Sequence, residues 1–232
     1  MLIDTLRALF NGYGVDFAQI LAQILSVLAV TFLILPLHEL AHAFVAYKLG
    51  DFTAKNRGRL TFNPLASVDV LGTLSMLLFG FGWAKPVPVE PRFFKHPKRD
   101  MALVAAAGPV SNVLAGLLGA LIYTGMYAFQ VPANMLTGFL YEFLWYYILV
   151  NISLAVFNLV PIPPLDGSKI LMMLLPDRWI QSYYRYQNII GSVGFVLLFS
   201  GLFRGPVGAL QTGLTRTILI IAEQPYRLFG LL

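Results

Sequence analysis

The sequence has no cysteine and few charged residues. Because cysteine is absent, disulfide bonds and thiolate metal ligands are excluded, and any metal site must use nitrogen and oxygen donors. Charged residues make up only 12% of the 232 residues and hydrophobic residues 58%, which excludes an ordinary soluble domain. We therefore expect an integral, multi-pass membrane protein in contact with the lipid bilayer.

The formal net charge of +5 comes from basic residues in short loops beside apolar segments. Such loops usually mark the cytoplasmic side of a membrane protein, so the charge does not indicate a nucleic-acid partner. Basic residues flank segment 68–83 on both sides and recur in loop 161–185, whereas connection 130–137 has none. We expect the plasma (inner) membrane of a prokaryote, with the active site toward the cytoplasmic side.

The apolar segments predict an all-α polytopic fold with about five to six transmembrane helices. Segment 68–83 makes only about 24 Å of helix, and both its flanks are basic, so we expect it to be re-entrant. Residues 1–16 are too short to span and predict an interfacial amphipathic helix, followed by a single membrane-embedded domain over 17–232. The full spans are expected at 17–47, 101–129, 138–160, 186–203 and 206–222.

Residues His38-Glu39-Leu40-Ala41-His42 form an HExxH pattern at the end of the first apolar segment. Residues four apart share one face of a helix, so His38 and His42 can bind zinc together while Glu39 acts as the catalytic base toward water. Burial of these groups in lipid is costly unless they have such a role. The sequence predicts one Zn²⁺ per chain and metal-assisted hydrolysis, and Pro36 predicts a kink just before the motif.

A catalytic zinc usually has three protein ligands, so another residue must join the two histidines. The preferred candidate is Asp166, which follows a proline-rich break at the end of a predicted span. An alternative role for Asp166 is to cap a short helix that begins near Ser168. Three other aspartates are rival ligands, although each lies where a turn or helix cap is expected: Asp51, Asp69 and Asp100.

Two asparagines are candidates for stabilising the transition state or positioning substrate. Asn158 is close in sequence to Asp166, and Asn112 lies in a later span; a side-chain amide from either can donate to developing negative charge. The alternative for each is a hydrogen bond between helices, which for Asn112 is favoured by a stripe of small residues at Gly108, Gly116 and Ala120.

Segments 57–62 and 85–89 predict a small interfacial β-hairpin or sheet. The first alternates polar and apolar residues, and the second is restricted to extended backbone by its prolines. Such an edge can bind an unwound substrate by strand addition, or it can be an ordinary hairpin with no substrate role.

Several stretches together resemble the site-2 protease family of intramembrane zinc metalloproteases. They are HExxH in a membrane helix, Asn158-Leu159-Val160-Pro161-Ile162-Pro163-Pro164-Leu165-Asp166-Gly167, Gly108-Pro109-Val110-Ser111-Asn112, and the run from Phe62-Asn63-Pro64 to Val89. The resemblance covers the core at about residues 33–175 and is that of a minimal form without an appended soluble domain.

This resemblance implies that His38, His42 and Asp166 bind zinc and that Glu39 is the catalytic base. It also implies an endopeptidase that cuts membrane protein substrates in or near a transmembrane helix, as in regulated intramembrane proteolysis.

Two other classes of function use the same residues differently. In a membrane metal transporter they would form a transient ion site, but the later spans contain no further ionisable pairs along a path. A catalytically silent membrane scaffold would retain the fold alone, and the intact His38, Glu39, His42 and Asp166 argue against it.

Overall fold

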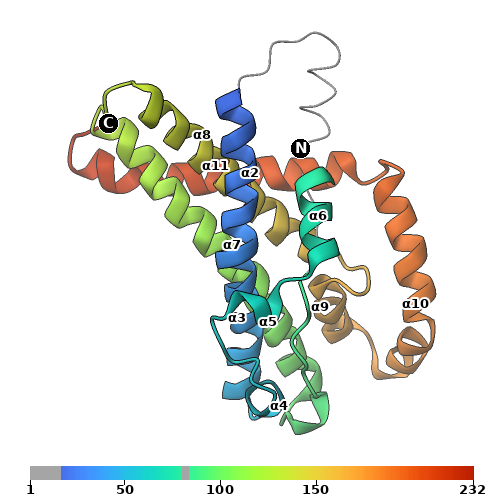
Figure 1. Cartoon of the computed structure of the whole chain (residues 1–232). Coiled ribbons are helices and arrows are strands. Elements are labelled where there is room, and N and C mark those ends of the chain that lie inside the picture. The colour runs from blue at the N-terminus through green and yellow to red at the C-terminus, as the bar shows by residue number, and fades with distance from the viewer. Residues whose placement is uncertain (1–16, 80–83) are drawn as a thin grey trace.

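The computed structural model describes residues 17–79 and 84–232, and in these residues the chain is helical (Figure 1). The amphipathic helix predicted for residues 1–16 lies outside them. The helices, in chain order, are α2 (Phe17–Ala29), η1 (Val30–Ile34), α3 (Leu35–Lys48), α4 (Thr53–Asn56), α5 (Pro64–Ser67), α6 (Val70–Phe79), η2 (Pro91–Phe93), α7 (Pro97–Ala128), α8 (Met135–Asn158), α9 (Asp166–Leu174), α10 (Asp177–Phe199) and α11 (Arg204–Leu228).

Three helices in the described residues are long and apolar enough to cross a membrane. They cover Ile20–Lys48, which joins α2, η1 and α3, and the whole of α7 and α8. Of the other two predicted spans, 186–203 begins in α10 and ends beyond it, and 206–222 lies within α11; the arginines, glutamines and threonines of these two helices make them less apolar. In the described residues the protein is thus an all-helical integral membrane protein, and the total of five to six spans stays a prediction.

The lipid-facing side of α7 shows why these helices suit a membrane. Large apolar side chains remain exposed along its length, at Leu103, Val110, Leu114, Leu118 and Ile122. Water would disfavour such a continuous apolar surface, whereas hydrocarbon does not.

The chain departs from α-helical geometry immediately before the HExxH motif. Pro36 has no N–H, so it cannot bond the carbonyl four residues earlier. The preceding turn, η1, is π-helical, and the Leu35 N–H donates to the Val30 carbonyl. A π-helical turn therefore lies just before Pro36, where the kink was predicted, and α3 after it presents His38 and His42 on its buried side.

Helix α7 lies at the centre of the fold and packs against α3, α8, α9 and α11. Close approach to α8 depends on small residues: a Cβ added to Gly119 would lie 2.7 Å from the Tyr147 ring, and one on Gly116 would lie 3.1 Å from Ile152. Ala120 on the same side is fully buried. The small-residue stripe predicted on this helix is therefore a packing face.

The described residues on either side of segment 68–83 lie close together. The Lys85 N–H donates to the carbonyl of Ser67 at 2.7 Å, so the two ends of the segment meet. Helix α6 occupies its first part, with Met76 fully buried against α2 and α8. Residues 80–83 lie outside the described residues, so the re-entrant path stays a prediction.

The predicted β-hairpin or sheet is absent, because neither 57–62 nor 85–89 forms a strand in the described chain. Gly58 has a φ of +66° and ends α4 in a turn, so the first segment is not extended at its start. In the second, Pro86 and Pro88 have no N–H to donate, and the Lys85 carbonyl accepts from the Arg59 guanidinium at 2.6 Å. The Arg59 side chain, and not a neighbouring strand, thus supplies the donor to the Lys85 carbonyl.

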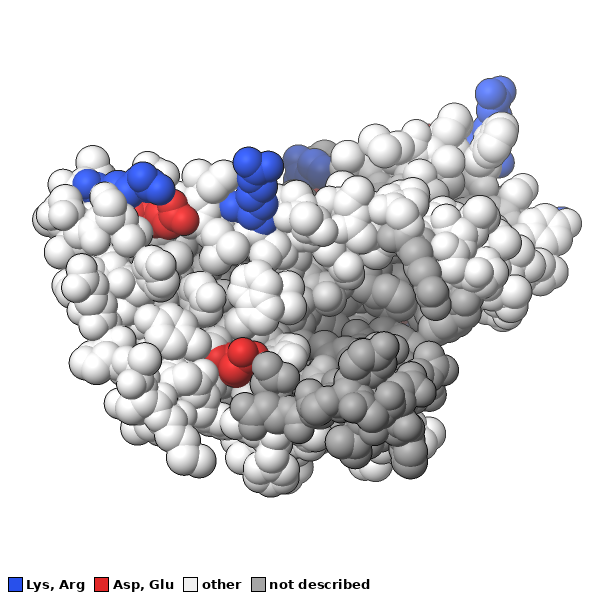
Figure 2. All heavy atoms as spheres, turned by 90° about the horizontal axis from the view of Figure 1, so that it is seen from above, with Lys and Arg blue, Asp and Glu red and all other residues white. Residues whose placement is uncertain are grey.

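The two ends of the molecule differ in charge. Basic residues lie in the loops around α4 and η2, where α3 ends and α7 begins, at Lys48, Lys55, Arg57, Arg59, Lys85, Arg92, Lys95, Lys98 and Arg99. The opposite end, seen from above in Figure 2, shows few charged side chains on a mostly uncharged surface.

Candidate metal centre

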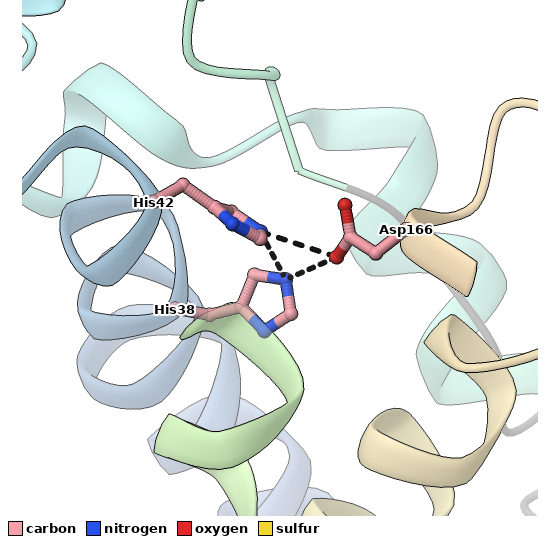
Figure 3. Close-up of side chains that lie close together, drawn as sticks. All are labelled: His38, His42 and Asp166. Atoms are coloured by element: carbon pink, nitrogen blue, oxygen red, sulfur yellow. Dashed lines mark hydrogen bonds and ion pairs between the residues drawn. The ribbon is translucent and has the colours of Figure 1, made fainter. Parts of the chain in front are cut away.

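His38 and His42 on α3 and Asp166 at the start of α9 point toward one another (Figure 3). The two histidine Nε2 atoms are 3.1 Å apart, and Asp166 Oδ2 lies 3.3 Å from that of His38 and 3.1 Å from that of His42. All three residues are buried. Helix α3 supplies the pair because its residues four apart share a face, and the break before α9 brings the carboxylate to them.

These three atoms fit a zinc ion. Zinc at about 2.0–2.1 Å from tetrahedral nitrogen and oxygen ligands separates neighbouring ligands by roughly 3.3 Å, close to the observed spacing of 3.1–3.3 Å. Two imidazoles and one carboxylate are also a donor set found in catalytic zinc sites, which leave a position open for water. The residues present therefore suit zinc as the resident metal.

The far nitrogen of each imidazole is held by a carbonyl oxygen. His38 Nδ1 lies 2.5 Å from Asn112 Oδ1, and His42 Nδ1 lies 2.6 Å from the backbone oxygen of Val104. A carbonyl can only accept, so each Nδ1 carries the proton and each Nε2 keeps its lone pair for the metal. Helix α7 thus fixes the tautomer and the ring orientation of both ligands.

Gly108 of α7 makes room for the two imidazoles. A Cβ at this position would overlap His42 Nε2 and lie 2.5 Å from His38 Nε2. Any larger residue would therefore push the rings away from their shared position. The sequence presented Gly108 only as part of a packing stripe and of the Gly-Pro-Val-Ser-Asn stretch, without this role.

Asp166 is the first residue of α9, and Leu165 is the cap residue, so the alternative of Asp166 as the N-cap is wrong. Gly167 is required next to it, because a Cβ there would overlap the carbonyl group of Leu159. Burial acts to raise the pKa of the Asp166 carboxyl, but the neighbouring His38, His42 and Lys169 more than offset burial. The pKa lies well below its usual range, so this ligand is ionised at neutral pH.

The three rival aspartates lie away from this site and have structural partners. Asp51 accepts from the N–H groups of Thr53 and Glu90, and Asp69 accepts from the Gly72 N–H at the start of α6. Asp100 accepts from the His96 N–H and the Arg99 guanidinium. Each is in a turn or near a helix start, as the sequence indicated.

Glu39 lies in the same cavity as the three ligands. This cavity has a volume of about 360 Å³ and is otherwise mostly apolar, with Leu35, Ala84, Pro86, Val87, Val89, Leu154, Phe157 and Phe195 among its lining residues. Glu39 Oε2 accepts the Val87 N–H at 2.9 Å. The segment that was expected to be a strand therefore positions the carboxylate of Glu39.

The two asparagine candidates occupy different places. Asn112 is fully buried behind His38, and its Nδ2 lies 3.5 Å from Asn151 Oδ1 on α8. It therefore links His38 to the contact between α7 and α8. Asn158 lines the cavity, but its amide donates to the Leu154 carbonyl of its own helix at 3.0 Å. Only Asn158 is placed where a substrate can reach it.

Comparison with known proteins agrees with this site. Residues 125–201 match the family described as Peptidase family M50. The chain is 44% identical over 165 residues, 70% of its length and 74% of the relative's, to YwhC of Bacillus subtilis, provisionally named a zinc metalloprotease.

More distant relatives carry the same kind of name. The zinc metalloprotease MJ0392 of Methanocaldococcus jannaschii is 26% identical over 72% of this chain and 40% of its own length. Rip2 of Mycolicibacterium smegmatis, also provisionally named a zinc metalloprotease, is 35% identical over 56% of this chain and 50% of its own. No solved structure gives a significant match.

Proposed function

The chain belongs to peptidase family M50, the site-2 protease family, and is a zinc-dependent protease; from this premise we propose that it hydrolyses peptide bonds in or near transmembrane helices of membrane proteins. Regulated intramembrane proteolysis is the process in which such cleavage is used. The partners are then membrane protein substrates with a transmembrane helix, and the lipid bilayer itself.

One observation carries this proposal: two of the three metal ligands, His38 and His42, come from a helix long and apolar enough to span a membrane. His38 and His42 lie inside Ile20–Lys48, and Lys48 ends α3 at the basic end of the molecule. At 1.5 Å per residue, His42 and His38 lie roughly 9 and 15 Å along the helix from Lys48. A bond cut at that depth belongs to a substrate segment that is itself in the membrane.

The residues of the site divide the reaction between them. When bound, zinc supplies a Lewis acid that polarises the scissile carbonyl and makes water a stronger nucleophile at neutral pH. Glu39 accepts the proton from the attacking water at its carboxylate and later delivers it to the leaving amine. The Val87 N–H holds Oε2 of Glu39, which leaves Oε1 as the oxygen that exchanges this proton.

A substrate helix must unwind to be cut, because its own hydrogen bonds enclose each peptide group. The cavity of about 360 Å³ has room for a few extended residues rather than for a helix about 10–12 Å across. Its apolar walls favour apolar side chains next to the cut bond. We assign carbonyl groups of segment 85–89 as the acceptors for the N–H groups of the extended substrate. The segment offers mainly acceptors to an added strand, because Pro86 and Pro88 have no N–H to donate.

The basic loops at the end of α3 favour a cytoplasmic orientation for the site. Lys and Arg are retained on the cytoplasmic side of membrane proteins, and the other end of the molecule shows few charged groups (Figure 2). We assign the site to the cytoplasmic side on this basis, and we propose the plasma (inner) membrane of a prokaryote because the relatives reported above are bacterial and archaeal proteins.

The test is cleavage of a purified single-span membrane protein by wild type and by Glu39→Gln, each purified in detergent with its zinc content measured. Glu39→Gln preserves the shape of the side chain and its acceptor for the Val87 N–H but removes the base. We expect one zinc per chain in both proteins and cleavage by wild type alone. Cleavage by both would remove Glu39 as the base, and zinc without cleavage by either would exclude this class of substrate.

Substrates can then be identified in cells by comparative membrane proteomics of strains that carry wild type or Glu39→Gln. The expected result is a set of single-span proteins that accumulate uncut in the Glu39→Gln strain. An unchanged membrane proteome would argue against membrane proteins as substrates.

A further inference from the structure

Lys169 lies at the metal centre on the side of Asp166 that faces away from the histidines. Its Nζ is 3.3 Å from Asp166 Oδ1, whereas both histidine contacts of Asp166 are made by Oδ2. Lys169 also lines the cavity that contains Glu39. The two oxygens of the ligand carboxylate therefore have different partners.

We propose that Lys169 is a positioning residue that keeps Asp166 bound to zinc through Oδ2 alone. A carboxylate can bind a metal through one oxygen or both, and an ammonium beside Oδ1 competes for the second oxygen. Binding through both would fill the coordination position that a catalytic zinc keeps open for water. Lys169 thus preserves the place at which water is activated beside Glu39.

The geometry of α9 brings the two residues together. Asp166 and Lys169 are three residues apart, so they share one face of the helix. The Asp166 side chain is 8% exposed and that of Lys169 is 36% exposed. The contact therefore lies at the edge of a buried site, where water screens it less than it would on an open surface.

Lys169 also lies where two cavities adjoin. Together with Pro164 and Phe195 it lines both the active-site cavity and a more open one of about 830 Å³ between α9 and α10. Lys169 therefore lies on a wall that the two cavities share. At 36% exposure the Lys169 side chain is partly hydrated, which favours a charged ammonium next to the zinc ligand Asp166.

A simple surface ion pair that stabilises the first turn of α9 is the alternative. Such a pair would contribute to helix stability but would not affect how the metal is coordinated. The two roles are separated by a measurement on the metal itself, which also needs no substrate. The inference rests on the zinc centre and not on the proposed substrate class, so either can fail without the other.

The experiment uses the full chain in detergent with Co²⁺ in place of zinc, because the visible absorption of Co²⁺ falls when four-coordination becomes five-coordination. Wild type, Lys169→Met and Lys169→Arg are compared, with the exposed Lys95→Met as the matched control. We expect an intense four-coordinate spectrum for wild type, Lys169→Arg and Lys95→Met, and a weaker five-coordinate spectrum for Lys169→Met. Turnover of the zinc form of Lys169→Met should fall about 10–100-fold at unchanged KM.

An unchanged Co²⁺ spectrum in Lys169→Met would overturn the inference, as would a failure of Lys169→Arg to restore the wild-type spectrum. If Lys169→Met does not fold, Lys169→Gln provides a second uncharged variant with the same expected spectrum. A five-coordinate spectrum in Lys169→Met supports the inference even when no cleavage of a membrane substrate is detected in any variant.

Discussion

Gly108→Ala adds a single carbon to the molecule, at the point where α7 faces both histidine ligands. The new Cβ would overlap His42 Nε2 and lie 2.5 Å from His38 Nε2. Ordinary contacts of a Cβ begin at 3.4 Å, so the rings or α7 must move by about 1 Å. The hydrogen bonds that the two rings donate to Asn112 and Val104 hold them from behind and oppose that movement.

The expected loss follows from this displacement. The three ligand atoms now lie 3.1–3.3 Å apart, and a shift of about 1 Å in one ring takes it out of the range for a shared zinc. Changes that disturb how metal ligands are held typically cost about 10–100-fold in metal affinity. We therefore expect zinc affinity to fall about 100-fold, or about 2.8 kcal/mol at roughly 1.4 kcal/mol per factor of ten.

Zinc affinity is measured by competition with a chelator on protein purified in detergent, and thermal unfolding without metal is measured in parallel. Gly213→Ala on α11 is the matched control, because a Cβ there meets no atom within 4 Å, and its zinc affinity should equal that of wild type. A Gly108→Ala protein that binds zinc as tightly as wild type would refute the assigned geometry of the site.

Three further predictions follow from contacts around the site. Val87→Pro removes the N–H that holds Glu39 and should lower kcat about 10–100-fold with zinc content unchanged, whereas Val87→Ala shortens the side chain but keeps the N–H and most activity; equal activity of the two would contradict the role of this bond. Asn112→Leu removes the acceptor for His38 Nδ1 and should weaken zinc binding about 10–100-fold in a chelator titration, while Asn112→Asp, which keeps an acceptor, should retain it. Gly167→Ala places a Cβ against the Leu159 carbonyl and should destabilise the protein by about 1–3 kcal/mol, seen as a lower midpoint of thermal unfolding; an unchanged midpoint would show that the Asp166 turn is looser than described.

The sequence predicted the parts of the site that are encoded locally. HExxH places His38 and His42 on one helical face by spacing alone, and the prolines before Asp166 predict a break that turns a carboxylate inward. The spans at α3, α7 and α8 followed from apolar length. The structure brings the three predicted ligands together from segments more than a hundred residues apart in the sequence.

Contacts that depend on tertiary packing could not be read from the sequence. Val104 contributes a backbone oxygen, which every residue has, and Gly108 contributes the absence of a side chain. Lys169 was counted only as a basic loop residue. Their roles depend on how α7 and α9 lie against α3, which no local pattern specifies.

The strand prediction failed for a related reason. Alternation and prolines indicate extended backbone, but they do not indicate its hydrogen-bond partners. Here the N–H groups of Lys85, Val87 and Glu90 bind Ser67, Glu39 and Asp51 rather than a neighbouring strand. The segment holds the carboxylate of Glu39, the proposed catalytic base, and it forms no sheet with residues 57–62.

The most direct test of the central claim is to map the bond that is cut. A single-span substrate is placed in liposomes with zinc-loaded wild type or Glu39→Gln, and the products are identified by mass spectrometry. The account predicts a cut in or near the membrane helix of the substrate, made by wild type and not by Glu39→Gln. A cut confined to a water-exposed domain far from the membrane, or one made equally by both proteins, would contradict it.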